Sequence, residues 1–202
     1  RAVATPEHDV VDSPYDGREL ARVPRCGPEQ VDDAVAAGVA ALAHPLPPWR
    51  RAEVLEAAAS SLGRHRDELA GLISAEAAKP IRTARTEAER AVDTFRAAAV
   101  EARTLAGEVV PMEGHRPGDG KLAFTLRVPR GVVGAITPFN FPLNLVAHKV
   151  APAIAAGCPV VVKPAGRTPL SAIRLQELLL DECGLPPEWF AVVPGPGGTV
   201  GD

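Results

Sequence analysis

The feature that most limits how this chain can fold is the alternation of strand and helix patterns from residue 131 onward. Short apolar runs are typical of strands buried in a parallel sheet, and apolar residues at helical spacing separate them. We expect strands at 131–136, 159–162 and 190–193 and helices at 144–156 and 169–183. Alternating β and α elements with short connections predict an α/β fold with a parallel, doubly wound sheet.

The ends of the two expected helices carry signals of their own. Gly157 and Gly184 follow them, and glycine is favoured just past a helix C-terminus. Thr168 and Pro169 are expected to supply the N-cap and the first-turn proline of the second helix. In doubly wound sheets, ligands bind beyond the carboxyl ends of the strands. The candidate binding loops are therefore 137–143, 163–168 and 194–201.

The part of the chain before this alternation reads as a hairpin followed by helices. Val10, Val11, Leu20 and Val23 flank a turn at 13–17, and a helical pattern opens at Pro28. A long helical region follows from about 50 to 106, interrupted near Gly63 and Pro80. Its mixed charges are typical of solvated helix faces. On that basis no function is assigned to Glu53, Glu56, Arg64, Glu68 or Arg90.

Between the helices and the sheet lies a segment with a period of two. Leu122, Phe124, Leu126 and Val128 alternate with Lys121, Ala123, Thr125 and Arg127. This pattern predicts a strand with one buried face, as an arm or edge element. An exposed apolar strand favours aggregation unless something covers it, and a partner subunit is a plausible cover. We therefore expect a homo-oligomer, either a dimer or a tetramer.

Composition excludes several classes of function. A net charge of −3 over 202 residues argues against nucleic-acid binding, which usually needs a basic face. The cysteines Cys26, Cys158 and Cys183 have no metal-ligand spacing, and an odd, scattered set favours a reduced, cytoplasmic protein. No signal peptide is visible in residues 1–12, and no apolar run is long enough to span a membrane.

Each candidate loop offers chemistry that the residues alone leave open. Asn140 could donate to an oxyanion, or it could bond its own loop, as asparagine often does in turns. Lys163 could bind a sugar hydroxyl or phosphate, with the next helix start favouring an anion, or it could simply be solvated. The glycines of 195–201 could admit a nucleotide or form a plain tight turn.

Taken as strings, these segments closely resemble the aldehyde dehydrogenase superfamily. The resemblance rests on PRGVVGAITPFNFPLNLVAHKVAPA (129–153), AGCPVVVKPA (156–165) and TPLSA (168–172). Upstream, Glu76-Ala-Ala-Lys-Pro-Ile81, Ala84-Arg-Thr-Glu87 and Thr94-Phe-Arg96 look like the family's helices before the sheet. The resemblance implies NAD(P)-dependent oxidation of an aldehyde to a carboxylic acid. In the family a cysteine thiolate attacks the aldehyde, and a glutamate activates the water that releases the acid.

The resemblance also implies roles for individual residues. Asn140 matches the asparagine that binds the oxyanion, and Lys163 matches the lysine that holds the adenosine ribose. Thr137, Pro138 and Phe139 match the loop lining the cofactor cleft, and Gly197 and Gly201 match glycines passing close to the adenine. Lys149 matches a common lysine in the helix after Asn140. Where the family often has a glutamate that favours NAD, this chain has Gly166 followed by Arg167. That departure indicates that NADP is tolerated or preferred.

The resemblance further implies a division of the chain and a boundary on its activity. We expect a hairpin and helices of the cofactor-binding domain in 1–112, a β arm in 113–130, and an incomplete Rossmann-like βαβαβ unit in 131–202. The family's nucleophilic cysteine and general-base glutamate lie beyond residue 202. The three cysteines here suit packing positions. This chain alone is therefore expected to be inactive.

Two further points stay open at the level of sequence. The chain could be part of a complete dehydrogenase, or a truncated, non-catalytic homologue serving as a nucleotide-binding or oligomerisation module. The stretch 122–130 looks most like family members acting on small hydroxylated or anionic aldehydes. Arg96 or Arg103 could then hold an anionic tail, although both suit surface helix positions.

Overall fold

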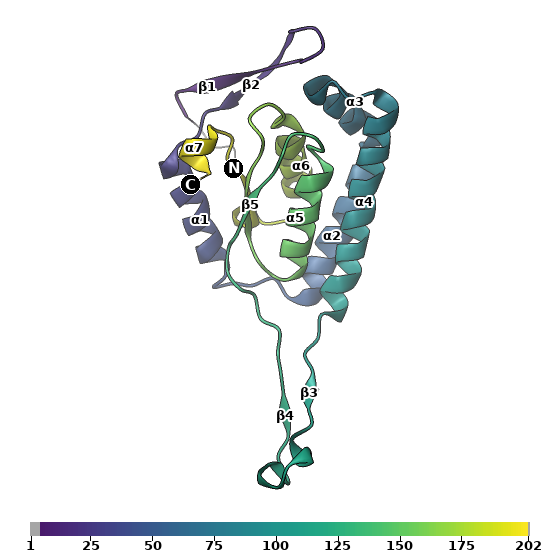
Figure 1. Ribbon diagram of the computed structural model, residues 1–202, viewed down its shortest axis with the longest axis vertical. Helices are drawn as coiled ribbons and strands as arrows, with labels where there is room; N and C mark the ends of the chain where they lie inside the picture. Colours follow the sequence, from purple (N-terminus) through teal and green to yellow (C-terminus); the bar gives the residue numbers. More distant parts are fainter. Residues whose placement is uncertain (1–4, 202) are drawn as a thin grey trace.

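The structure is a computed structural model that describes residues 5–201, and its centre is a three-stranded parallel sheet with helices around it (Figure 1). The helices are α1 (Pro28–Ala41), α2 (Pro48–Arg64), α3 (Arg66–Ala77), α4 (Ile81–Thr104), α5 (Asn144–Ala155), α6 (Leu170–Asp181) and α7 (Gly197–Val200). The strands are β1 (His8–Asp12), β2 (Glu19–Pro24), β3 (Val109–Val110), β4 (Ala123–Phe124), β5 (Val133–Ile136), β6 (Val160–Lys163) and β7 (Phe190–Val192). Short 3-10 turns lie at Met112–Gly114, Arg116–Gly118 and Pro187–Trp189.

The sheet has the parallel order expected from the sequence. Its strands lie in the order β5-β6-β7, with Val133 opposite Val160 and Val160 opposite Phe190. Every residue of the central strand β6 is buried, which explains its unbroken Val-Val-Val run. The observed strands and helices of this region agree with the predicted bounds to within two residues. Gly157 and Gly184 adopt φ of +80° and +66° after α5 and α6, a backbone conformation that favours glycine.

The helices before the sheet form the other half of the core. Helix α4 packs against α2, α3 and α5, and α2 also contacts α5. Alanine fills most of these contacts: Ala84, Ala88 and Ala91 of α4 are all buried. Small side chains allow helices to approach closely, so a core with few aromatic residues can still pack densely. The predicted breaks near Gly63 and Pro80 correspond to the α2–α3 and α3–α4 junctions.

The segment with a period of two is less regular than predicted. Only Ala123–Phe124 forms a strand, paired antiparallel with Val109–Val110, and this ribbon extends away from the rest of the molecule (Figure 1). Within residues 5–201 nothing covers the apolar face, because Leu122, Phe124 and Leu126 are 79%, 60% and 73% exposed. Cover by a partner subunit stays a prediction. The ribbon projects beyond the reach of the chain's own core, so its apolar side chains have no cover within residues 5–201.

Candidate functional site

The three candidate loops begin side by side at one edge of the sheet. Ile136 of β5 lies opposite Lys163 of β6, and the Thr137 N–H donates to the Lys163 carbonyl at 3.1 Å. On the other side of β6, the Val193 N–H donates to the Val162 carbonyl at 2.9 Å. The chain therefore leaves all three strands at their carboxyl ends together, where ligands of doubly wound sheets bind.

The first loop, 137–143, exposes the side-chain amide of Asn140. Thr137 is buried, whereas Pro138, Phe139 and Asn140 are exposed. Within residues 5–201, the Asn140 side chain makes no hydrogen bond, and its backbone carbonyl instead accepts from Lys79 Nζ at 2.7 Å. The alternative in which the Asn140 amide bonds its own loop is therefore not observed. Its donor is available to an oxygen that approaches this edge.

Lys163 brings the second and third loops together. Its side chain is buried, and Nζ donates to the neighbouring Pro164 carbonyl at 2.9 Å. Burial away from water lowers the pKa of this ammonium group. The aliphatic part lies beside Gly201, where an added Cβ would be 3.6 Å from Lys163 Cδ and 2.6 Å from the Gly197 carbonyl. A side chain at 201 would thus be forced against the turn, whereas a Cβ on Gly197 would meet nothing within 4 Å.

The start of α6 differs from the prediction. Helix α6 begins at Leu170 with Pro169 in the cap position, and no side chain of its own caps it. The Thr168 hydroxyl instead donates to the Phe139 carbonyl at 3.5 Å, which joins the first and second loops. The predicted Thr168 N-cap is wrong because Glu76 of α3 fills that function. Its carboxylate accepts from the Leu170 N–H at 2.8 Å, the Ser171 N–H at 3.0 Å and the Ser171 hydroxyl.

This arrangement corrects a second expectation. The start of α6 was expected to favour a bound anion, but the anion present there is the protein's own Glu76 carboxylate, which is 1% exposed. Burial raises the pKa of Glu76 to about 7, against three hydrogen bonds that lower it. Gly166 and Arg167 lie outside this capped turn and are exposed. With Phe139, Glu76 and β1 they line a pocket of about 430 Å³.

The start of α5 is capped in the same manner by a second buried glutamate. Glu87 of α4 is 1% exposed, and its carboxylate accepts from the Leu143 N–H at 3.0 Å and the Asn144 N–H at 3.1 Å. Unlike Glu76, it has a counter-charge: Lys79 Nζ donates to its other oxygen. The same ammonium lies 4.0 Å from the centre of the Phe141 ring. Glu76, Lys79 and Glu87 were not among the predicted site residues.

The cysteines occupy packing positions. Cys26, Cys158 and Cys183 are all buried and free. Burial raises the pKa of the Cys26 and Cys183 thiols to about 11, which disfavours the thiolate needed for nucleophilic attack. The Cys183 thiol donates to the Leu178 carbonyl at 3.2 Å. The arginines considered for an anionic tail are paired: Arg96 with Asp93 at 3.2 Å and Arg103 with Glu56 at 2.6 Å.

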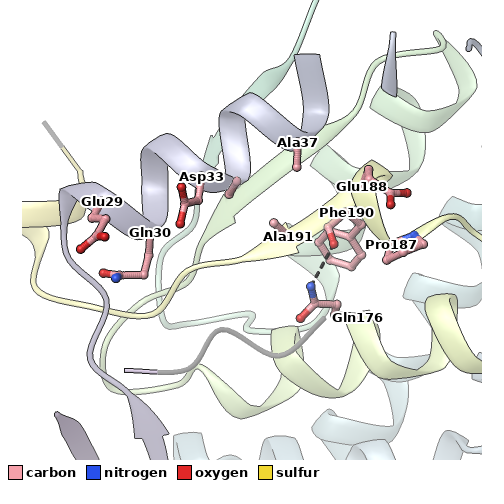
Figure 2. Close-up of a pocket in the computed structure, with 10 residues that line it drawn as sticks. Glu29, Gln30, Asp33, Ala37, Gln176, Pro187, Glu188, Phe190 and Ala191 are labelled. Atoms are coloured by element: carbon pink, nitrogen blue, oxygen red, sulfur yellow. Dashed lines mark hydrogen bonds between the residues drawn. The ribbon is translucent and has the colours of Figure 1, made fainter. Parts of the chain in front are cut away.

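A larger pocket of about 530 Å³ lies beside the edge strand β7, between α1 and α6. Figure 2 shows Glu29, Gln30 and Asp33 of α1 facing Gln176 of α6 and the residues just before and within β7. Gln176 Nε2 donates to the Phe190 carbonyl at 2.9 Å, which satisfies a polar group on this edge strand. No residue of the three candidate loops lines this pocket.

Residues 5–201 provide neither a cluster of metal ligands nor a helix that could span a membrane. No group of three or more His, Cys, Asp or Glu side chains there could hold a metal ion. In the same residues, no helix has both the length and the apolar character needed to cross a membrane.

The fold and this edge define a doubly wound α/β protein of the dinucleotide-binding type. The chain belongs to the aldehyde dehydrogenase family, whose model matches residues 4–202. It is 42% identical over 198 residues to 3-sulfolactaldehyde dehydrogenase from Priestia aryabhattai, covering 98% of this chain and 41% of that protein. The chain therefore spans about two fifths of that relative's length.

Solved structures give the same result. Glyceraldehyde-3-phosphate dehydrogenase GapN from Methanocaldococcus jannaschii, complexed with NADP, matches with a TM-score of 0.89 and 35% identity, covering 98% of this chain and 43% of that one. PnpE in complex with nicotinamide adenine dinucleotide matches with a TM-score of 0.91 and 36% identity, covering 96% and 39%. The expected family and fold class are confirmed.

Proposed function

We propose that this chain supplies the cofactor-binding edge and the oxyanion-stabilising Asn140 of an NAD(P)-dependent dehydrogenase that oxidises an aldehyde to a carboxylic acid. The observation that carries the proposal is the meeting of three loops at one sheet edge, with the Asn140 amide exposed and without a partner in residues 5–201. When bound, the nicotinamide cofactor accepts the hydride that leaves the substrate. Asn140 donates to the substrate oxygen as negative charge develops on it.

The residues at this edge suit a dinucleotide. Lys163 Nζ donates only to the adjacent Pro164 carbonyl among the described residues, so it has further donors for a ribose hydroxyl. Gly197 and Gly166 each have open space where a Cβ would be, which leaves room for a nucleotide to approach the backbone. We assign Gly201 to the turn beside Lys163, and Thr137, Pro138 and Phe139 to the wall of the cofactor cleft.

Gly166 and Arg167 are the residues proposed to accommodate the 2′-phosphate that distinguishes NADP from NAD. With no carboxylate at 166, nothing there repels a phosphate, and the exposed Arg167 is free to pair with one. We expect Arg167→Glu to weaken NADP binding on the order of 10-fold or more while changing NAD binding little. Calorimetric titration of both cofactors into the 202-residue chain measures this. Equal affinity of the variant and the original chain for NADP would contradict the assignment of Arg167.

The substrate class follows from the relatives and is a proposal for this chain. The names of two relatives specify 3-sulfolactaldehyde and glyceraldehyde 3-phosphate, both small, hydroxylated and anionic. We infer an aldehyde of the same kind. The longest natural polypeptide containing this sequence should therefore show a higher kcat/KM for glyceraldehyde 3-phosphate than for propanal. A preference for propanal would overturn the inference.

Because all three cysteines are buried, we expect the 202-residue chain alone to bind the cofactor without oxidising aldehydes. Measurable turnover by the pure chain would contradict this. Absence of any NAD or NADP binding would instead favour a non-catalytic oligomerisation module.

The ribbon of β3 and β4 is proposed as the oligomerisation arm, with residues 113–130 as its core. Its exposed apolar side chains, Leu122, Phe124, Leu126 and Val128, form a face that a second copy of the chain could cover. Light scattering on the chain should show a dimer or tetramer, and Phe124→Glu should shift it toward the monomer. A monomer in both cases would remove this role.

A further inference from the structure

We propose that Lys79 is a positioning residue that holds the Asn140 loop in the geometry needed for oxyanion stabilisation. The proposal rests on the function proposed above for Asn140. Lys79 lies in the turn between α3 and α4, 61 residues before Asn140 in the chain, yet its Nζ donates to the Asn140 carbonyl at 2.7 Å. No other hydrogen bond to Asn140 occurs in residues 5–201. Within the described residues, the hydrogen bond from Lys79 is therefore the one that holds Asn140 in place.

The same ammonium group makes two more contacts with the loop. It donates to the Glu87 carboxylate, whose other oxygen accepts from the Leu143 and Asn144 amides at the start of α5. It also lies 4.0 Å from the centre of the Phe141 ring, within the range of a cation–π interaction. One side chain thus holds the loop at Asn140 and Phe141 directly and at residues 143 and 144 through Glu87.

Lys79 itself is held firmly. Its backbone carbonyl accepts from the Ser74 hydroxyl at 2.7 Å, and the preceding Ala78 has a φ of +48°, a left-handed conformation that costs energy for a residue with a Cβ. The side chain is 12% exposed. A rigid base matters because a displacement of about 1 Å at a catalytic donor can cost on the order of 10²-fold in rate.

The test removes the Lys79 ammonium group without leaving a buried charge unpaired. Lys79→Met alone leaves Glu87 buried without a counter-charge and could prevent folding, so the informative variant is Lys79→Met with Glu87→Gln. Glutamine keeps an acceptor for the Leu143 and Asn144 amides while removing the buried charge. Arg82→Met is the control, because Arg82 is an exposed basic residue three positions along the chain.

The first readout is backbone order, measured by NMR relaxation on the 202-residue chain. We expect the order parameter of the Asn140 amide to fall from about 0.85 to below about 0.6 in the double variant, and to stay unchanged in the control. The α5 amides after Asn144 should keep their order. An unchanged order parameter at Asn140 in the double variant overturns the proposal, whatever Asn140 does in catalysis.

The second readout is kinetic, in the longest natural polypeptide that contains this sequence. We expect the double variant to lose about 10- to 10²-fold in kcat with little change in the KM for the cofactor. In an Asn140→Ala background the same change should cost less than about 3-fold, because its effect passes through Asn140. Full additivity overturns the role of Lys79. An Asn140→Ala variant with full kcat would instead overturn the function proposed for Asn140.

Discussion

The two helices that follow the first two sheet strands are capped alike but balanced differently. Each N-terminus meets a buried glutamate from the preceding helices: Glu87 at α5 and Glu76 at α6. Glu87 is neutralised by Lys79, whereas in residues 5–201 no Lys, Arg or His forms an ion pair with Glu76. Glu76 relies on backbone amides and the Ser171 hydroxyl, and burial raises its pKa to about 7.

The same capping geometry therefore occurs with a counter-charge on the glutamate, at Glu87, and without one within residues 5–201, at Glu76. The α5 cap, beside Asn140, is an ion pair between Glu87 and Lys79. The α6 cap, beside Gly166 and Arg167, is a carboxyl group that changes its charge near neutral pH. Four experiments test this contrast between the two caps.

The largest effect is expected from Glu87→Ala. The substitution leaves the Lys79 ammonium without its carboxylate and the Leu143 and Asn144 amides without acceptors, which should cost about 3–5 kcal/mol of unfolding free energy. Urea unfolding measured at pH 7 tests this. Glu89→Ala is the matched control, since Glu89 is on the same helix but exposed, and it should change stability by less than about 0.5 kcal/mol. Equal effects at the two positions would contradict a structural role for the buried cap.

The second effect concerns pH. Glu76 has a pKa of about 7 when folded against an ordinary value of 4.5, so the folded state binds the proton more tightly. The unfolding free energy gained from this tighter proton binding is fully present below pH 4.5 and is lost as pH rises through about 7. At about 1.4 kcal/mol for each pKa unit, the loss amounts to about 3 kcal/mol.

Glu76→Gln should remove this pH dependence. The unfolding free energy of the original chain, relative to that of the variant, should fall between pH 4 and pH 8. Urea unfolding at several pH values gives the two curves. Parallel curves would show that Glu76 has the same pKa in the folded and unfolded states.

A smaller effect is expected from Ser171→Ala. The Ser171 hydroxyl donates to the Glu76 carboxylate and lowers its pKa, so its removal should weaken the charged cap by about 1 kcal/mol. The loss should be greater at pH 8 than at pH 5, because the carboxylate form depends more on the donor. A loss that is the same at both pH values would argue that the hydroxyl does not act through the charge of Glu76.

The smallest effect is expected at Phe141. Phe141→Leu keeps most of the apolar volume but removes the ring that faces Lys79 Nζ, which should cost on the order of 0.5–1 kcal/mol at pH 7. Thermal unfolding of the variant beside the original chain measures it. A variant as stable as the original chain would contradict a favourable contact between the ring and the ammonium group.

The sheet and its helices could be predicted because their determinants are local. Unbroken apolar runs, helical spacing and glycines such as Gly157 specify elements without reference to distant residues. The alternation of apolar and other residues at 122–128 is also a local pattern. Burial of its apolar face, however, requires a second surface, and residues 5–201 provide none. The pattern indicates an apolar face, but it does not indicate which surface covers that face.

The capping glutamates were missed because their partners lie far along the chain. Their positions did carry a signal: Glu87 lies between Ala84 and Ala91 on the buried face of α4, and Glu76 follows Leu69 and Ile73 on that of α3. A carboxylate in an apolar stripe needs a partner. Which partner it meets depends on tertiary packing, so the Thr168 cap was the simpler local prediction and proved wrong.

The two glutamate caps also bear on how the molecule assembles. Each joins residues separated by 56 to 95 positions, so the starts of α5 and α6 have no acceptors until α3 and α4 have docked. The sheet half cannot complete its hydrogen bonding alone, and α3 and α4 bury two carboxylates whose backbone N–H partners lie in the sheet half. Lys79 of the helical half also pairs with Glu87. Contacts of such long range are expected to form late and together.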